Sequence, residues 1–181
     1  MKAITRNLLA AMGAVAGLSL FAAPLTASAT STATGTLQAQ IVITSNCTVS
    51  GGNASLDFTS HVSNETNAAN ASNGKFTVTC TNQTPYTIGL QSSASDAPTD
   101  GTGQMVASAG SGISQKIGYQ LYQDPSFNTK WGNNTATTGG NVQGSTGTGD
   151  AQSYTVYGKT TSTLNVPAAT YSDTVNISVY Y

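Results

Sequence analysis

The alternation that decides the fold is clearest in residues 174–181, which read TVNISVYY. Val175, Ile177 and Val179 fall on every second position, and polar residues stand between them. Successive side chains of a strand point to opposite faces, so this stretch presents one apolar and one polar face. Such a pattern is typical of an antiparallel strand with one buried side. Tyr181 continues the apolar row.

Other short stretches repeat this period of two, and each is rich in β-branched or aromatic residues, which favour strands. No window after residue 30 carries apolar residues at helical spacing. The further predicted strands are residues 37–43, 76–80, 86–90, 117–121 and 154–158.

Turn-forming residues separate these stretches, as the connections of an antiparallel sandwich require. No Pro-rich linker interrupts the chain, so we expect one all-β domain. The Gly-rich residues 132–150 predict a flexible low-complexity loop. The turn signals are Gly51-Gly52-Asn53, Asn73-Gly74, residues 98–103, Asp124-Pro125 and Pro167.

The chain is poor in charge, with six Lys or Arg and seven Asp or Glu among 181 residues. The charged fraction of 7% is far below the roughly 25% of an average soluble domain. Disordered acidic tails and coiled coils need more charge, so the composition excludes both classes. A net charge of −1 offers no basic footprint for nucleic acid.

The first 29 residues have the three parts of a signal peptide. Lys2 and Arg6 supply a positive start, an apolar run follows over residues 8–23, and Ala27-Ser28-Ala29 supplies a cleavage pattern. The alternative is a membrane anchor, for which the run is short. Removal of residues 1–29 leaves four Lys, seven acids and no Arg, a net charge of 4 − 7 = −3 that disfavours anionic ligands.

Export also bears on Cys47 and Cys80, the only two cysteines of the chain. In an oxidising compartment an isolated pair is expected to form a structural disulfide. A redox or metal site would need CxxC spacing or histidine partners, which the sequence lacks. We therefore expect no cofactor and no metal.

Residues able to carry catalysis are few. His61 is the sole histidine and stands in a polar loop, where a solvated side chain is expected. Asp57 and Asp173 could form the carboxylate pair of a glycosidase, but turn or strand-end carboxylates are the favoured interpretation. Trp131 and exposed tyrosines could bind sugar, although packing roles are more common. The sequence therefore predicts no enzyme.

The most informative segments lie near the two ends of the chain. Residues 31–35 form a polar lead, and Thr36–Ile43 is an alternating stretch that precedes the first cysteine. The second alternating stretch, residues 173–181, has no tail after it that could cover its edge. An uncovered sheet edge invites the addition of a strand from another chain.

The order of several short motifs, together with the cysteine pair, resembles the spore coat protein U domain family. These domains include the pilin subunits of archaic chaperone–usher pili, and the likeness is strongest to the major subunits of Csu-type pili. The motifs are Ile43–Val49, Leu56-Asp57-Phe58, Phe76–Cys80, Tyr119–Asp124, Trp131-Gly132 and Val166–Val175.

The resemblance implies an incomplete immunoglobulin-like antiparallel β-sandwich that lacks its last strand. A periplasmic chaperone lends this strand, and an outer-membrane usher exchanges it for the N-terminal extension of a neighbouring subunit. Carried onto this sequence, residues 1–29 are the signal peptide, 30–46 the extension with its donor strand, and 47–181 the pilin domain. The implied site residues are the disulfide Cys47 and Cys80, the donor residues Leu37, Ala39, Ile41 and Ile43, and the acceptor residues Val175, Ile177, Val179 and Tyr181.

These features predict a structural subunit of a surface pilus that supports adhesion and biofilm formation, with copies of itself and other subunits as partners. Ala39 is a small donor residue, so its place in the groove should be shallow. A secreted carbohydrate-binding module or a spore or surface coat protein is the alternative. The sequence leaves open whether the donor strand folds back into its own groove, since residues 44–46 permit a local hairpin.

Overall fold

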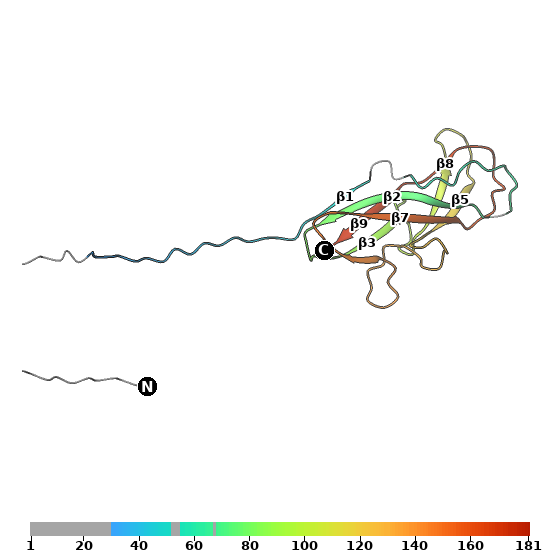
Figure 1. The fold of residues 1–181 in the computed structure, drawn as a ribbon. Coiled ribbons are helices and arrows are strands. Elements are labelled where there is room, and N and C mark those ends of the chain that lie inside the picture. The colour runs from blue at the N-terminus through green and yellow to red at the C-terminus, as the bar shows by residue number, and fades with distance from the viewer. Residues whose placement is uncertain (1–29, 52–54, 67) are drawn as a thin grey trace, which may run out of the picture. The chain divides into compact units, whose positions relative to one another are not determined.

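The computed structural model describes residues 30–51, 55–66 and 68–181, which contain nine strands and no helix (Figure 1). The predicted signal peptide, residues 1–29, lies outside the described residues. Among the residues described, no helix has the length and apolarity that a membrane crossing needs. The strands are β1 (Cys47–Ser50), β2 (Asn70–Cys80), β3 (Pro85–Ser92), β4 (Thr102–Ala107), β5 (Lys116–Tyr122), β6 (Gln143–Thr146), β7 (Ala151–Thr160), β8 (Tyr171–Ser172) and β9 (Val175–Tyr180).

The strands form two antiparallel sheets that pack face to face. Sheet A has the order β1-β2-β7-β5-β4-β8, and sheet B has the order β6-β3-β9. Ile88 and Leu90 of sheet B pack in one core with Phe76 and Leu121 of sheet A. The fold is therefore the all-β antiparallel sandwich that the alternation predicts.

The core is centred on Trp131, which is fully buried. Its indole Nε1 donates a hydrogen bond to the backbone oxygen of Ile88 at 2.9 Å, and its ring packs against Phe76 and Tyr154. Burial raises the pKa of Tyr154 to about 12. A buried indole satisfied in this way stabilises the sandwich from inside.

The predicted turn at Asn73-Gly74 is wrong, because both residues lie inside β2. Three steps along β2, from Ala71 to Gly74, face two steps along β7, from Gly158 to Val156. This β-bulge places the two turn-forming residues in the ladder, where one extra residue is accommodated by a local kink.

The prediction of a flexible loop over residues 132–150 is also wrong in part. Gly132 is buried, and its backbone exchanges hydrogen bonds with Leu90 and Asn141. Residues 143–146 form β6 at one edge of sheet B. Glycine here permits close backbone packing, since a Cβ on Gly132 would lie 2.2 Å from the backbone oxygen of Thr99.

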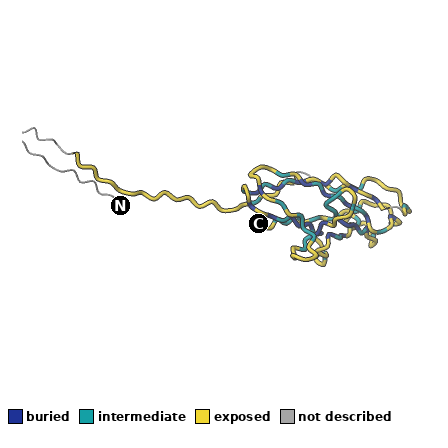
Figure 2. Tube along the Cα trace, turned by 60° about the horizontal axis from the view of Figure 1, so that its bottom comes forward, coloured by how far each residue is buried: buried dark blue, intermediate teal, exposed yellow. Residues whose placement is uncertain are grey.

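Residues 42–181 form one compact unit, and the part of the chain before it is a separate unit. The strand predicted over residues 36–43 is absent, because these residues belong to none of the nine strands. A strand exists only as part of a ladder. Figure 2 shows residues 30–46 exposed along their length, whereas the buried positions follow the strands.

Candidate functional site

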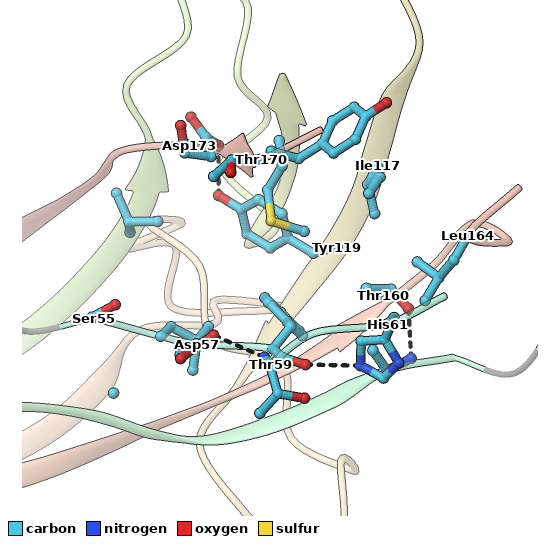
Figure 3. A pocket seen from close by; sticks show the side chains of 18 of the residues that line it. Ser55, Asp57, Thr59, His61, Ile117, Tyr119, Thr160, Leu164, Thr170 and Asp173 are labelled. Carbon is cyan, nitrogen blue, oxygen red and sulfur yellow. Dashed lines mark hydrogen bonds between the residues drawn. The ribbon is translucent and has the colours of Figure 1, made fainter. Parts of the chain in front are cut away.

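A cleft of about 1020 Å³ opens into the core of the sandwich (Figure 3). Two irregular segments, residues 55–63 and 166–174, line it together with apolar side chains from strands of both sheets. The cleft is therefore an opening onto the hydrophobic core itself rather than a surface dimple. The apolar side chains from strands are Phe76, Leu90, Met105, Ile117, Leu121, Val156, Val175 and Ile177.

Strand β9 borders this cleft and, among the described strands, is hydrogen-bonded only to β3. Val175, Ile177 and Val179 point to the core, as the alternation predicts, yet all three remain only partly buried. An apolar row that faces the core and stays half exposed lacks a covering element on one side.

Tyr181, which the alternation puts in the same row, lies beyond the end of β9 and is 59% exposed. The ladder with β3 ends at the pair Thr87 and Tyr180, although β3 itself continues to Pro85. The alternation of the sequence does not reveal where the pairing between two strands stops.

The segment predicted as donor strand is exposed. Leu37 is 95% exposed, Ile41 81% and Ile43 72%, and Ala39 is exposed as well. These three large apolar side chains lie at alternating positions and all face water. An exposed apolar row of this kind is typical of a contact surface.

A hydrogen bond across the cleft joins two of its lining residues, Tyr119 and Asp173. The hydroxyl of Tyr119 on β5 donates a hydrogen bond of 2.7 Å to Oδ2 of Asp173, just before β9. Burial raises the pKa of Tyr119 well above its usual range, and the carboxylate of Asp173 raises it further. Tyr119 therefore stays protonated as a donor. Sequence reasoning missed this residue, because only the topology brings β5 to Asp173.

Asp57 lies in the other wall, where its Oδ1 accepts a hydrogen bond of 2.8 Å from the backbone nitrogen of Thr59. The Asp57 backbone exchanges hydrogen bonds with the Asn73 side chain, which ties this wall to the β2 bulge. The structure thus brings both candidate carboxylates, Asp57 and Asp173, to the cleft. Each holds a local structural hydrogen bond, as expected of turn carboxylates.

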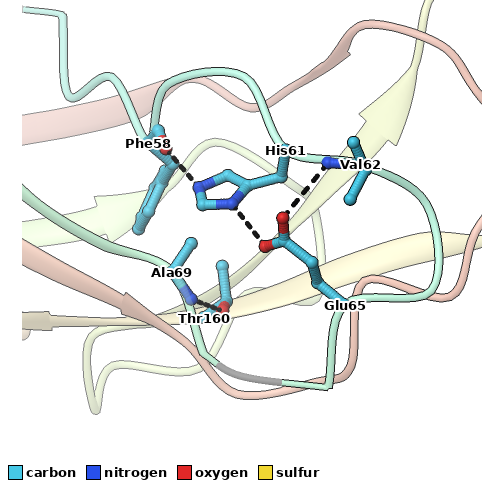
Figure 4. A network of polar contacts seen from close by, with 6 residues as sticks. All are labelled: Phe58, His61, Val62, Glu65, Ala69 and Thr160. Atoms are coloured by element: carbon cyan, nitrogen blue, oxygen red, sulfur yellow. Dashed lines mark hydrogen bonds and ion pairs between the residues drawn. The ribbon is translucent and has the colours of Figure 1, made fainter.

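His61 lines the same cleft and holds its own loop together (Figure 4). Its Nδ1 lies 2.7 Å from Oε2 of Glu65, and its Nε2 lies 2.8 Å from the backbone oxygen of Phe58. The Glu65 and Phe58 hydrogen bonds raise the pKa of His61, and the His61 hydrogen bond lowers that of Glu65. The ring is exposed, as expected, but it is an ordered link rather than a free solvated side chain.

This loop is also tied to the wall formed by the chain before β8. The hydroxyl of Ser63 donates to the backbone oxygen of Val166 at 2.8 Å, and Leu164 N donates to the backbone oxygen of Glu65 at 3.0 Å. These bonds join the two irregular segments that line the cleft, so they fix its shape.

Cys47 and Cys80 form a disulfide. They are directly opposite in the β1–β2 ladder, so the bond fastens edge strand β1 to sheet A. Among the described residues no three His, Cys, Asp or Glu side chains gather in a way that could hold a metal ion.

A comparison with known proteins identifies the family of this chain. A family model described as Spore Coat Protein U domain matches residues 33–178. The chain belongs to this family. No curated protein matches it. The spore coat protein U match includes both the alternating segment before Cys47 and most of β9.

One solved structure is similar to this spore coat protein U domain, with 19% identity and a TM-score of 0.45. It is the pre-assembly complex of a chaperone with a tip adhesion subunit, CsuC–CsuE, from the archaic chaperone-usher Csu pili of Acinetobacter baumannii. The match covers 77% of this chain and 40% of that chain.

Leu56 and Phe58 line the cleft, although the sequence analysis assigned them no role at the site. They belong to a motif that carries the family resemblance, and their side chains cover Gly158, whose added Cβ would lie 2.7 Å from Leu56. The alternation of two apolar residues around Asp57 was the signal that could have placed them at the cleft.

Proposed function

We propose that this chain is a structural subunit of a surface pilus, assembled by the chaperone–usher pathway through donor-strand exchange. Residues 36–43 of one copy enter the cleft of the next and pair with the free edge of β9. Residues 30–46 then act as the donor extension, and residues 47–181 as the acceptor domain. Export after cleavage of residues 1–29, a periplasmic chaperone and an outer-membrane usher complete the assembly route.

The observation that carries this proposal is the unpaired edge of β9 beside an open cleft. Val175 and Ile177 line that cleft and stay half exposed. A strand added there would meet unmatched backbone donors and acceptors along β9 and an apolar surface behind them. This is the arrangement that strand addition exploits, with the backbone supplying affinity and the pockets supplying specificity.

The occupant that fits is the exposed segment of a second copy. Leu37, Ile41 and Ile43 repeat with the period of two that a strand requires, and the walls of the cleft are apolar. Full burial of each large side chain stabilises by roughly 1.5–3 kcal/mol before ordering costs. Ladder hydrogen bonds inside a dry cleft add to this, because leaving them unmade is costly.

Ala39 has a matching place in this scheme. The Tyr119–Asp173 hydrogen bond places two polar side chains among the apolar residues that line the cleft. A methyl side chain covers a polar pair with less apolar surface than Leu or Ile would. We therefore assign Ala39 to the level of this hydrogen bond.

The test compares two substitutions on adjacent residues of the donor segment. Ile41→Asp puts a charge on the row that enters the cleft, and Gln40→Asp puts the same charge on the opposite row. Polymers extracted from cells that carry the chaperone and usher are separated in SDS without heating. Ile41→Asp should abolish the SDS-resistant ladder, while Gln40→Asp should retain it.

Both residues are exposed, so neither substitution should alter the unfolding temperature of the monomer. Identical ladders from the two variants would refute donation by this row of side chains. A ladder that survives deletion of residues 31–43 would refute donation by the segment altogether.

A surface coat component is the second candidate, favoured by the description of the family. A carbohydrate-binding module that uses Trp131 is no longer one, because that side chain is inside the core. Electron micrographs of the cell surface separate the remaining two, since a coat gives a layer and a pilus gives filaments that disappear with the gene. Filaments with strand donation would also account for adhesion and biofilm formation.

A further inference from the structure

All four lysines of residues 30–181 project from the same face of sheet A. Lys75, Lys116 and Lys159 lie on β2, β5 and β7, at positions that alternate with core-facing residues. Lys130 is bridged to Tyr122 at the end of β5, and the next residue, Trp131, turns into the core. Since alternate residues of a strand face opposite ways, these four cations share the face turned away from the core.

The register of the sheet sets the spacing of three of them. Lys75 pairs with Thr155 on β7, four residues from Lys159, and Lys159 pairs with Gln120 on β5, four residues from Lys116. With about 3.3 Å per residue and about 4.8 Å between strands, each step is roughly 14 Å. The three lysines therefore form a diagonal row across β2, β7 and β5, which lie side by side (Figure 1).

Aromatic side chains stand beside this row. Tyr122 and Tyr157 are cross-strand partners, and both are half buried. Phe127 packs edge-on against Tyr122 with ring centroids 5.4 Å apart, and Nζ of Lys159 lies 6.0 Å from the Phe127 centroid. Phe127 has a φ of 57°, a backbone conformation that is costly for a bulky residue and is held here by its loop.

The loop that presents Phe127 is built around Asp124. Its carboxylate accepts hydrogen bonds from the backbone nitrogens of Ser126, Asn128 and Thr129. These bonds lower the pKa of Asp124, so the loop stays fixed at neutral pH. The aromatic residue beside Lys159 is therefore preorganised.

The four lysines form no ion pair within the part of the chain that the structure describes. None donates a hydrogen bond, and the single salt bridge there joins His61 and Glu65. The pKa of the Asp100 carboxyl is lowered, first by the hydrogen bonds from Thr102 and then by the positive charge of Lys130. Unpaired cations gathered on one face of a chain with a net negative charge form a patch that attracts anions.

We propose that this lysine face (Lys75, Lys116, Lys130 and Lys159) binds an acidic polysaccharide. The row of point charges spans about 28 Å, which suits an extended polymer with repeated carboxylates better than a compact ligand. Lysines without arginine forks give charge attraction without bidentate phosphate recognition. The net negative charge of residues 30–181 disfavours anionic ligands for the chain as a whole, but the register of sheet A gathers its cations on one face. The adjacent rings of Tyr122 and Tyr157 offer apolar surface to the C–H faces of sugar rings.

A second copy of the chain fits this face less well. Five of the seven acids already accept hydrogen bonds from other groups of the same chain, so few carboxylates remain for a neighbour's lysines. The five are Asp57, Glu65, Asp100, Asp124 and Asp173. Lys75 is also among the residues that line the cleft, whereas Lys116, Lys130 and Lys159 are not, so these three lysines stay available when a strand is donated.

The test measures retention of the purified full-length protein on immobilised polygalacturonate, with neutral dextran as the matched control polymer. Wild type should bind polygalacturonate at low salt, release it as salt rises, and ignore dextran. The triple variant Lys75→Gln, Lys116→Gln, Lys159→Gln should lose at least tenfold in affinity. The corresponding triple Arg variant keeps the charges and should retain binding.

Two further readouts keep the outcome decisive. Both triple variants change exposed or half-exposed side chains, so their unfolding temperatures should match wild type. Equal retention of the Gln variant, or equal retention on both polymers, would overturn the proposal. A Gln variant that loses self-association in sedimentation while still binding polygalacturonate would assign the face to contact between copies instead.

Discussion

The centre of the core and the cleft beside β9 belong to one hydrophobic interior, but their apolar side chains are buried to different extents. Around the centre, Val78, Ile88 and Trp131 are fully buried. At the cleft, Leu56, Phe58 and Ile177 pack against the same core but remain partly exposed. The difference teaches that the sandwich fully buries its own centre and leaves the flank beside β9 only partly buried.

The largest expected effect is at the completed centre. Trp131→Ala removes a fully buried indole and its hydrogen bond, so we expect a loss of about 3–5 kcal/mol in the free energy of unfolding. Denaturant unfolding measures it. Leu56→Ala at the cleft is the matched control and should cost clearly less, because its side chain is only partly buried. Equal losses would mean that the two regions are equally complete.

Filling the cleft should give the next largest effect. A synthetic peptide of residues 36–43, added to a chain that lacks residues 31–43, should raise the free energy of unfolding by about 2.7 kcal/mol at a hundred times its dissociation constant. Thermal unfolding with increasing peptide measures the shift. A peptide carrying Ile41→Asp should give none, and stabilisation by both peptides would contradict binding through that row.

The Tyr119–Asp173 hydrogen bond across the cleft gives a smaller effect. Tyr119→Phe removes the hydroxyl that donates to Asp173, and we expect a loss of about 1 kcal/mol in stability. Because burial raises the pKa of Tyr119, the same variant should also remove the tyrosine that ionises last in an ultraviolet titration. An unchanged titration would contradict the buried position of this hydroxyl.

The smallest effect concerns the exposed His61–Glu65 link. A raised pKa in the folded state means that His61 adds stability below its ordinary value of 6.5 and loses that contribution as pH rises through the folded value. The pKa of Glu65 is lowered from its ordinary value of 4.5, so Glu65 adds stability above pH 4.5. That contribution is lost as pH falls through the pKa of the folded state. Stability of the loop should therefore peak between pH 4.5 and 6.5.

Nuclear magnetic resonance of the residue 58–65 loop follows this dependence without relying on global unfolding. His61→Gln is the matched variant, and its loop signals should not change between pH 6 and 8. A wild-type loop with signals equally insensitive to pH would show that the link does not hold the loop.

The sequence was sufficient for strands with regular alternation and insufficient for the others. β3, β5, β7 and β9 carry one apolar face, so their period of two revealed them. β4 lacks regular alternation and β6 is short and polar, so both depend on the ladders that β5 and β3 offer to them. Local turn signals failed at Asn73-Gly74 for the same reason, since the ladder with β7 outweighs the local preference.

The sequence was sufficient to predict the apolar residues of β9 at the candidate site, but it was not sufficient to predict the cleft. Val175, Ile177 and Val179 follow from alternation alone. The cleft needs Tyr119 and the segment around Leu56 to meet them, and that meeting depends on strand order. Sequence reasoning also divided the lysines among separate segments, because only the register of sheet A brings them to one face.

The strand order also has a kinetic consequence. Lys75 pairs with Thr155 across 155 − 75 = 80 residues, and Leu90 pairs with Ile177 across 177 − 90 = 87 residues. Such distant pairings require the entropy of a long loop to be lost before any contact rewards it, which places folding in the slow range of roughly milliseconds to seconds. Until residues 175–180 pair with it, β3 keeps an open edge, so the folding chain exposes an aggregation-prone strand during that interval.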